Sequence, residues 1–348
     1  MSQTVLVTGA TGFIAQHVVN ELLKNGYTVI GTARSETKSQ PLIKLFKEKY
    51  PNGNLSFVIV EDISTDSAFD DVLINNKSIT NVIHTASPFS YGIDKSLEDA
   101  YLNPAVNGTL NILNAIYKYA PQVENVIITS SFAALKQYGN EYTTHIHTNE
   151  SWNPINWEND VKTENDGYSA SKTYAEKAAR NFMIQQDPKP NFKLTTVNPP
   201  YVFGPQCFDD YVSNKLNTSN EVLNNITKID PSNNEPQVVF GALAIDVRDV
   251  AKFHVLPLSN ENLQSERIFL TSGPVTAQNV LNIMNESCDP LKGKIAIGDP
   301  SKTNEIIEKN CPKYDLSNLK SIIGDYEFIN LEKSIVDVFD QYYKVNSV

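Results

Sequence analysis

The chain has 348 residues, 41% of them hydrophobic, so it is long enough for one large domain or two smaller ones with an ample core. Its 40 acidic residues outnumber 29 basic ones and give a formal net charge of −11. This charge argues against a nucleic-acid partner or an anionic membrane surface, because both need clustered Lys and Arg.

The stretch from Thr4 to Ala15 predicts a phosphate-binding strand–turn–helix unit. An apolar run ends at Thr8 and enters a glycine-containing turn that leads into a helical pattern. Gly9 permits the turn, and Gly12 lets backbone N–H groups approach a pyrophosphate at the helix N-terminus. Ala15 lets the helix pack closely on the strand. The spacing is G-x-x-G-x-x-A rather than G-x-G-x-x-G, so the general dinucleotide fingerprint fits only loosely.

Further strands and helices alternate along the chain up to residue 197. We expect strands at 27–32, 55–60, 81–85, 125–129 and 192–197, and helices at 14–24, from after residue 38 to about 50, at 103–119 and at 166–185. The strands are almost uniformly apolar, which is typical of a parallel sheet covered on both faces. The sequence therefore predicts an α/β fold with a doubly wound parallel (Rossmann) sheet.

The second half of the chain has a weaker pattern. Residues 138–165 are polar and predict a long surface excursion, with Trp152 and Trp157 as its apolar anchors. Pro199 and Pro200 take the chain out of the sheet, and residues 238–250 return to sheet-like character. We expect a cofactor domain of residues 1–199 plus about 238–258. A smaller, discontinuous substrate domain takes about 200–237 plus 259–348, with the site in the cleft between the two.

Tyr168 and Lys172 are the first candidates for chemistry, because a spacing of four places them on one helix face. A cation beside a tyrosine lowers its pKa and suits it to proton transfer near neutral pH. The same spacing occurs in Tyr91…Lys95 and Tyr211…Lys215, but in polar, turn-rich stretches. Ser131 follows the fifth strand at the sheet edge where ligands bind, and its hydroxyl can bond a substrate carbonyl or a developing alkoxide. A serine-rich turn is the alternative for that residue taken alone.

Arg34 follows the second strand, about where a ribose-recognising residue is expected. An acid there would favour NAD, whereas Arg34 and Lys38 suit the 2′-phosphate of NADP(H). Two solvated surface charges are the alternative, and Glu36 lies between them.

Other candidates are weaker. His145 and His147 form an H-x-H pair with no evident third ligand, so we interpret them as solvated histidines and expect no metal. Phe89, Phe132 and Tyr201 follow predicted strand ends, where they could line an apolar substrate pocket or belong to an interdomain core.

The cysteines Cys207, Cys288 and Cys311 are odd in number and form no C-x-x-C pair, which is typical of reduced thiols in a cytoplasmic protein. The N-terminus lacks a basic region followed by a cleavable apolar segment, and no apolar run has the length of a membrane span. We therefore expect a cytoplasmic protein without a membrane partner.

Several stretches together resemble a known family. They are Gly9 to Ala15 with Gln16-His17, His84-Thr85-Ala86-Ser87-Pro88-Phe89, Pro104-Ala105-Val106-Asn107-Gly108, Ser131, Glu150-Ser151-Trp152-Asn153-Pro154, Tyr168…Lys172, Tyr201-Val202-Phe203-Gly204-Pro205 and residues 245–251. The chain resembles extended short-chain dehydrogenases/reductases of the dihydroflavonol-4-reductase-like branch. Within that branch it is similar to the fungal NADPH-dependent carbonyl reductases that act on methylglyoxal or 3-methylbutanal. The resemblance covers nearly the whole chain and thins after about residue 290.

The resemblance implies NADPH-dependent reduction of an aldehyde, ketone or α-dicarbonyl, with a role for each matching residue. Tyr168 would protonate the carbonyl oxygen, Ser131 would polarise it, and Lys172 would tune Tyr168. The cofactor would contact Gly9, Thr11, Gly12, Phe13 and Ile14 (pyrophosphate), Arg34 and Lys38 (2′-phosphate), Asp62 and Ile63 (adenine), and Thr85, Ala86, Pro199, Val202, Tyr168 and Lys172 (nicotinamide and its ribose).

Two other functions remain open from the sequence. One is a nucleotide-sugar epimerase or dehydratase, which needs a diphosphate-binding patch in the C-terminal part of the chain, where Arg248 and Arg267 are the only arginines after residue 199. The other is a non-catalytic NADP-sensing protein, which has no need of the Ser131, Tyr168 and Lys172 set. We expect a monomer or a homodimer.

Overall fold

The computed structural model describes residues 3–87, 94–212 and 216–346. Phe89, which was predicted for the substrate pocket, lies outside the described residues, as do Tyr91 and Lys215. By Cα proximity the chain divides into two compact units. Unit 1 comprises residues 1–136, 150–198 and 251–268, and unit 2 comprises 137–149, 199–250 and 269–348.

A seven-stranded sheet with the order β10-β7-β5-β4-β1-β2-β3 organises unit 1. The pairs β3–β2, β2–β1, β1–β4, β4–β5 and β5–β7 are all parallel. This arrangement confirms the predicted doubly wound sheet, and the order reverses between β1 and β4, where such sheets bind ligands. The strands are β1 Thr4–Thr8, β2 Thr28–Ala33, β3 Asn54–Ile59, β4 Ile79–His84, β5 Asn125–Thr129, β7 Lys193–Asn198 and β10 Arg267–Phe269.

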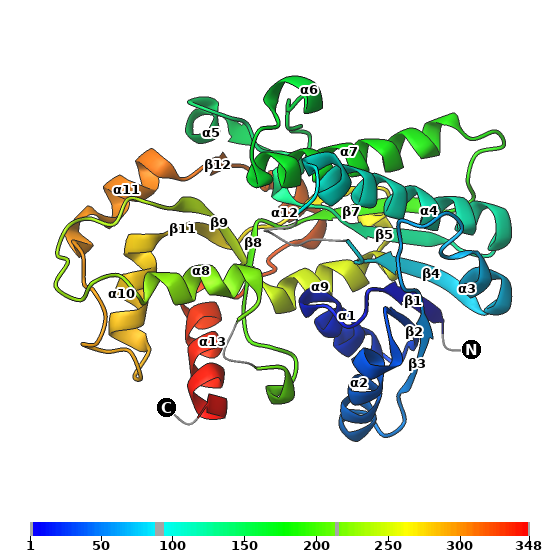
Figure 1. Ribbon diagram of the computed structural model, residues 1–348, viewed down its shortest axis with the longest axis horizontal. Helices are drawn as coiled ribbons and strands as arrows, with labels where there is room; N and C mark the ends of the chain where they lie inside the picture. The colour runs from blue at the N-terminus through cyan, green and yellow to red at the C-terminus, as the bar shows by residue number, and fades with distance from the viewer. Residues whose placement is uncertain (1–2, 88–93, 213–215, 347–348) are drawn as a thin grey trace. The chain divides into compact units, whose positions relative to one another are not determined.

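Helices cover both faces of this sheet. Helices α4 and α7 pack together on one face, and α1 and α2 lie on the other (Figure 1). Leu6 on β1, Val82 on β4 and Ile112 on α4 are fully buried in one apolar cluster. The helices are α1 Phe13–Lys24, α2 Glu36–Lys49, α3 Asp70–Asn75, α4 Asn103–Tyr119 after a π-helical turn Glu98–Leu102, α6 Trp157–Asp160, α7 Glu164–Gln185 and α9 Val247–Val255, with 3₁₀ turns at Phe132–Ala134, Leu256–Leu258 and Glu261–Leu263.

Unit 2 has its own sheet and its own core. Strand β9 pairs in parallel with β8 and antiparallel with β11, and β12 pairs with β6. Its strands are β6 Ile146–His147, β8 Tyr201–Phe203, β9 Gly241–Asp246, β11 Gly273–Thr276 and β12 Lys313–Tyr314. Its helices are α5 Glu141–Thr144, α8 Thr218–Ile226, α10 Ala277–Ser287, α11 Thr303–Asn310, α12 Ser317–Ile323 and α13 Leu331–Asn346, with 3₁₀ turns at Asp209–Tyr211 and Pro300–Lys302.

The structure corrects the expectation for residues 245–250. Strand β9 ends at Asp246, and residues from Val247 onward are helical in α9. Asp246 Oδ1 accepts a hydrogen bond from the backbone N of Arg248 at 2.8 Å, which satisfies a donor in the first turn of the helix. The apolar periodicity of so short a segment does not distinguish the two states.

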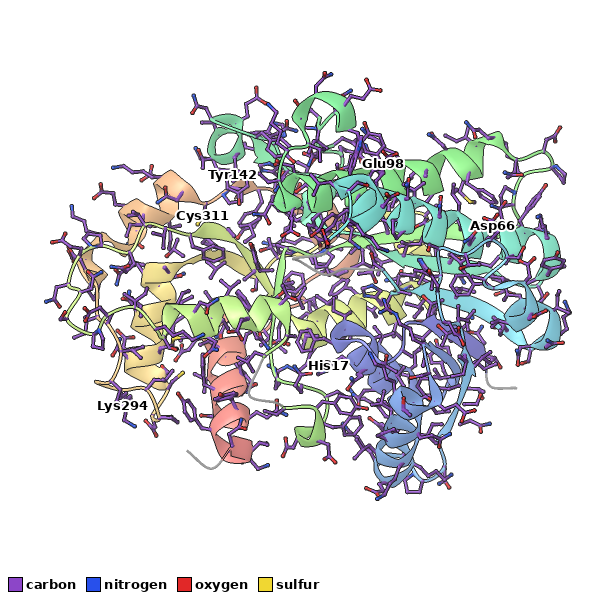
Figure 2. The ribbon with its side chains drawn as sticks, in the orientation of Figure 1. His17, Asp66, Glu98, Tyr142, Lys294 and Cys311 are labelled. Atoms are coloured by element: carbon purple, nitrogen blue, oxygen red, sulfur yellow. The ribbon has the colours of Figure 1, made fainter. Side chains whose placement is uncertain are left out.

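The polar segment 138–165 carries more structure than a surface excursion. It contains α5, β6 and α6, and Tyr142 on α5 donates to the backbone oxygen of Gly241 at 3.1 Å. Figure 2 shows Tyr142 and Cys311, which both belong to unit 2. Strand β8 directly follows Pro200 and joins the sheet of unit 2, as expected from the two prolines.

Candidate active site

The turn after β1 is shaped by the backbone of Gly9. Its φ is +63°, in the left-handed region, and a Cβ added there would lie 2.9 Å from Ala86 Cα. Two bonds from β2 fix the turn, because the backbone N of Gly9 donates to Thr32 Oγ1 at 3.0 Å and that of Ala10 to Thr32 O at 2.9 Å. The backbone conformation and the nearness of Ala86 therefore both require glycine at position 9.

Helix α1 begins in a way that suits an anion. Gly12 is its N-cap, no side chain caps the helix, and no acidic residue lies in its first turn. Gly12 has an ordinary φ of −77°, and a Cβ there would meet Gly9 O at 3.3 Å. The backbone conformation thus does not require glycine at position 12, whereas close approach of a phosphate to the open N–H groups would require it. The rings of Phe13 and His17 meet edge-on, with their centres 5.8 Å apart.

The candidate residues for the adenosine end of the cofactor follow β2 and β3. Arg34 lies between β2 and α2, and Lys38 lies in the first turn of α2. Both side chains are exposed. Asp62 Oδ1 accepts from Ser64 N at 2.8 Å and Ser64 Oγ at 2.7 Å. These bonds, with a smaller contribution from Arg34, lower the pKa of Asp62. Ile63 packs against α4, where a Cβ on Gly108 would lie 2.7 Å from Ile63 Cδ1.

The ends of β1 and β4 are bonded to each other through Thr8. Its Oγ1 accepts from the backbone N of Ala86 at 3.1 Å, and its carbonyl oxygen accepts from Thr85 Oγ1 at 2.5 Å. The same Oγ1 lies 2.8 Å from Nδ1 of His84. These bonds hold Thr85 and Ala86 beside the turn of Gly9, and all of them are within unit 1.

The three residues predicted to carry chemistry lie together in unit 1. Ser131 follows β5, and its Oγ accepts from the backbone N of Ala133 at 3.1 Å. Tyr168 Oη lies 3.5 Å from Ser131 Oγ, and Lys172 stands one helical turn farther along α7. A Thr163/Asp166 capping box fixes the start of that helix. Two hydroxyls at this separation can both donate to one oxygen at about 2.7 Å from each.

Lys172 lines a small cavity of about 20 Å³, which has the volume of one water molecule. Burial lowers the pKa of Lys172 to about 8. His84 lines the same cavity, and burial together with the charge of Lys172 lowers the pKa of His84 to about 3, so this imidazole is neutral. The sequence alone predicts no role for His84, because its partner Thr8 lies 76 residues away in sequence.

The remaining candidates are distributed over both units. Phe132 is buried in unit 1, whereas Pro199 and Val202 are buried in unit 2. Tyr201, also in unit 2, is 39% exposed and meets Phe240 edge-on at 5.2 Å.

The sequence-based interpretation of His147 as a solvated histidine was wrong. Its side chain is fully buried, its Nε2 accepts from the backbone N of Gln137 at 3.1 Å, and its Nδ1 lies 2.9 Å from Lys313 O. In the described part of the chain no group of three or more His, Cys, Asp or Glu side chains could hold a metal ion. These two hydrogen bonds of His147 join segments of unit 2, and its sequence neighbours do not reveal this structural role.

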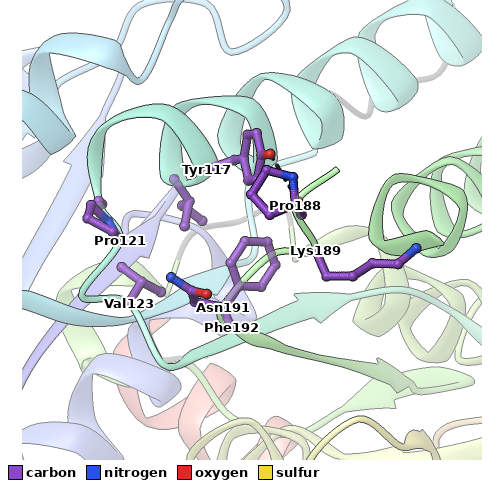
Figure 3. Close-up of a pocket in the computed structure, with 9 residues that line it drawn as sticks. Tyr117, Pro121, Val123, Pro188, Lys189, Asn191 and Phe192 are labelled. Carbon is purple, nitrogen blue, oxygen red and sulfur yellow. Dashed lines mark hydrogen bonds between the residues drawn. The ribbon is translucent and has the colours of Figure 1, made fainter. Parts of the chain in front are cut away.

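A larger pocket of about 310 Å³ lies at the other end of the strands of unit 1 (Figure 3). Val123 and Phe192, which line it, come just before β5 and β7, whereas Ser131 comes after β5. Tyr117 Oη donates to Pro188 O at 3.0 Å in its wall. This pocket is distinct from the predicted site.

No helix in the described residues combines the length and apolarity needed to cross a membrane.

Comparison with known proteins identifies the family. The pattern of the NAD dependent epimerase/dehydratase family matches residues 5–270. NADPH-dependent methylglyoxal reductase GRE2 of Saccharomyces cerevisiae is 42% identical over 346 residues, which is 98% of this chain and 98% of that protein. Putative NADPH-dependent methylglyoxal reductase GRP2 of Candida albicans is 39% identical over 341 residues, 97% of each chain. The crystal structure of yeast methylglyoxal/isovaleraldehyde reductase Gre2 complexed with NADPH has a TM-score of 0.91 at 40% identity, covering 99% of both chains.

These matches confirm the resemblance that the motifs indicated. The chain belongs to the NAD dependent epimerase/dehydratase family, within the extended short-chain dehydrogenases/reductases.

Proposed function

We propose that the protein is an NADPH-dependent reductase that converts an aldehyde, ketone or α-dicarbonyl into an alcohol. One observation carries this proposal: the hydroxyls of Tyr168 and Ser131 lie 3.5 Å apart, in the same unit as the glycine turn of β1. The relatives named as NADPH-dependent methylglyoxal reductases support it. The names of the relatives favour methylglyoxal or 3-methylbutanal (isovaleraldehyde) as substrates.

The fit of the cofactor rests on the open N-terminus of α1. Backbone groups of Gly9, Thr11, Gly12, Phe13 and Ile14 would bind the pyrophosphate. Arg34 and Lys38 would pair with the 2′-phosphate, because two cations follow β2 where an acid would favour NAD. Asp62 and Ile63 would flank the adenine, and Thr85, Ala86, Pro199 and Val202 would border the nicotinamide and its ribose, which Tyr168 and Lys172 would also contact.

The chemistry of this chain's own residues is proton transfer and charge stabilisation. Bound NADPH supplies the hydride that the carbonyl carbon accepts. Ser131 and Tyr168 donate hydrogen bonds to the carbonyl oxygen, which stabilises the negative charge that develops there. Tyr168 then gives its proton to this oxygen, and the charged Lys172 favours the tyrosinate that remains.

Apolar side chains would form the substrate pocket. Phe132 and Tyr201 are the described candidates, and Phe89 was predicted with them. An apolar pocket fits a small branched aldehyde better than a nucleotide sugar, which needs cations for its diphosphate.

A substrate panel tests the proposal. The oxidation of NADPH and of NADH is followed at 340 nm with methylglyoxal, 3-methylbutanal, a diketone and an aryl ketone. We expect turnover of at least one of these carbonyls, with NADPH preferred. Binding of NADPH without turnover of any carbonyl would contradict reduction and favour an NADP sensor. Release of a tightly retained nucleotide on denaturation, together with turnover of a nucleotide sugar, would favour an epimerase.

We also propose a cytoplasmic location and a monomer or homodimer. Cys288 and Cys311 are buried free thiols, as expected in a reducing compartment. Light scattering coupled to gel filtration distinguishes the monomer from the dimer.

A further inference from the structure

Glu176 shares a helix face with the two catalytic candidates of α7 and has no role in the proposed chemistry. It follows Lys172 by one turn and Tyr168 by two, and it is only 2% exposed. A carboxylate so deeply buried needs several hydrogen-bond donors. Its surroundings are therefore informative about the site.

The two carboxylate oxygens of Glu176 accept from different parts of unit 1. Oε2 accepts from Ser130 Oγ at 2.5 Å and from Asn198 Nδ2 at 2.8 Å. Oε1 accepts from Thr196 Oγ1 at 3.2 Å and from Arg267 Nε at 2.6 Å. Oε2 thus bonds residues that follow β5 and end β7, whereas Oε1 bonds Thr196 within β7 and forms the ion pair with Arg267.

The Oε2 side leads directly to Ser131. Ser130 precedes Ser131 in the chain, and its backbone N donates to Val197 O on β7 at 2.8 Å. Asn198, which is fully buried, donates from the same Nδ2 to Ser131 O at 3.2 Å. The chain before Ser131 is therefore linked to the carboxylate of Glu176 through the side chain of Ser130, and the carbonyl group of Ser131 is linked to it through the side chain of Asn198.

The Oε1 side anchors the carboxylate. Arg267 is 9% exposed, and its guanidinium carbon lies 3.8 Å from the centre of the Trp152 ring. Its Nη1 donates to Ser151 O at 2.7 Å. The guanidinium is thus itself fixed, so the position of Glu176 is set from β10 and from the segment before α6.

We propose that Glu176 is a positioning residue that fixes Ser131 against Tyr168 through Ser130 and Asn198. Glu176 and Tyr168 belong to one helix, so the carboxylate ties the end of β5 to the element that carries the tyrosine. Loss of these hydrogen bonds lets Ser131 move relative to Tyr168, while both hydroxyl groups remain in the protein. The effect on turnover rests on the proposed reduction, whereas the effect on the distance between the two hydroxyls does not.

The deciding variant is Ser130→Ala, because Glu176→Gln leaves the buried Arg267 without its carboxylate and destabilises the fold. Thr195→Val is the matched control. Thr195 is 2% exposed on β7, and its hydroxyl bonds Leu263 O at 3.3 Å and Ser265 N at 3.0 Å, away from Glu176. Both variants delete one buried hydroxyl, so both lower the melting temperature.

We expect Ser130→Ala to lower kcat by roughly 10- to 100-fold, since displacement of a reacting group by about 1 Å costs on that order. The dissociation constant of NADPH should stay within about threefold of wild type, and Thr195→Val should keep kcat within about twofold. Crystal structures should show a longer Tyr168 Oη to Ser131 Oγ distance in Ser130→Ala and an unchanged one in Thr195→Val.

Two results would overturn the positioning role: an unchanged distance between the two hydroxyls in Ser130→Ala, or equal losses of kcat in the two variants. If the wild type reduces no carbonyl, the proposed function fails, and the measured distances still decide the role of Glu176.

Discussion

Alanine substitutions at Gly9 and Gly12 separate a requirement of the backbone from a requirement of the ligand. At Gly9, the φ of +63° and the 2.9 Å approach to Ala86 Cα both oppose a side chain. The left-handed conformation costs about 1–2 kcal/mol for a residue with a Cβ, and overpacking adds about 1–3 kcal/mol. We therefore expect Gly9→Ala to lower the free energy of unfolding by about 2–5 kcal/mol.

At Gly12 the same substitution has a different consequence. The φ of −77° is ordinary, and the added Cβ would meet Gly9 O at 3.3 Å and Ala15 Cβ at 4.0 Å. Alanine is a poorer N-cap than glycine by up to about 1 kcal/mol, and the lower entropy of the unfolded chain offsets about 0.4–1 kcal/mol of this loss. The methyl group nevertheless stands where a phosphate approaches the helix. We expect stability within about 1 kcal/mol of wild type, and a dissociation constant of NADPH raised about tenfold or more.

Two measurements check this pair. Urea unfolding gives the change in stability, and quenching of protein fluorescence by NADPH gives the dissociation constant. The reasoning would be refuted if Gly12→Ala bound NADPH as the wild type does, or if it lost as much stability as Gly9→Ala.

Three further predictions concern the cofactor, the lysine and the second unit. Arg34→Ala should raise the KM for NADPH by roughly 10- to 100-fold, because one charge-assisted contact to phosphate contributes about 1.5–3 kcal/mol. The KM for NADH should stay nearly unchanged, since NADH has no 2′-phosphate. Equal changes for both cofactors would contradict the assignment of Arg34. Lys172, whose pKa burial lowers to about 8, is charged below that pH and loses its charge above it, so kcat/KM for reduction should fall as the pH rises through this value. A rate that is flat from about pH 7 to 10 would contradict the role of its charge. Asp249 accepts from Tyr326 Oη at 2.5 Å and Ile329 N at 2.8 Å, so Asp249→Ala should cost about 3 kcal/mol by urea unfolding, and a loss below about 0.5 kcal/mol would contradict this.

The parallel sheet could be predicted from the sequence because its strands are short apolar runs that end at polar or glycine residues. Strands β1 and β5 and helix α4 fall where they were predicted. Helix α9 could not be predicted, because its start depends on the side chain of Asp246, which bonds the backbone of Arg248. Local hydrophobicity carries no information about such a bond.

Only part of the candidate site could be predicted from the sequence. Ser131, Tyr168 and Lys172 stand at sequence positions that topology places at one sheet edge. Glu176 and His84 were missed, since their partners lie far away in sequence: Glu176 bonds Arg267 across 91 residues, and His84 bonds Thr8 across 76. His147 was misinterpreted for the same reason, because its partner Lys313 comes 166 residues later.

Tyr168→Phe tests the central claim most directly, with Tyr174→Phe as the matched control on the same helix. Tyr174 Oη accepts from Trp157 N at 3.1 Å and takes no part in the proposed proton transfer. In stopped-flow measurements of NADPH oxidation with saturating carbonyl, Tyr168→Phe should be slower by about 10²- to 10⁴-fold, the usual contribution of a general acid. NADPH affinity should change little, and Tyr174→Phe should react at close to the wild-type rate. A Tyr168→Phe enzyme that oxidised NADPH as fast as the wild type would show that this hydroxyl is not the proton donor.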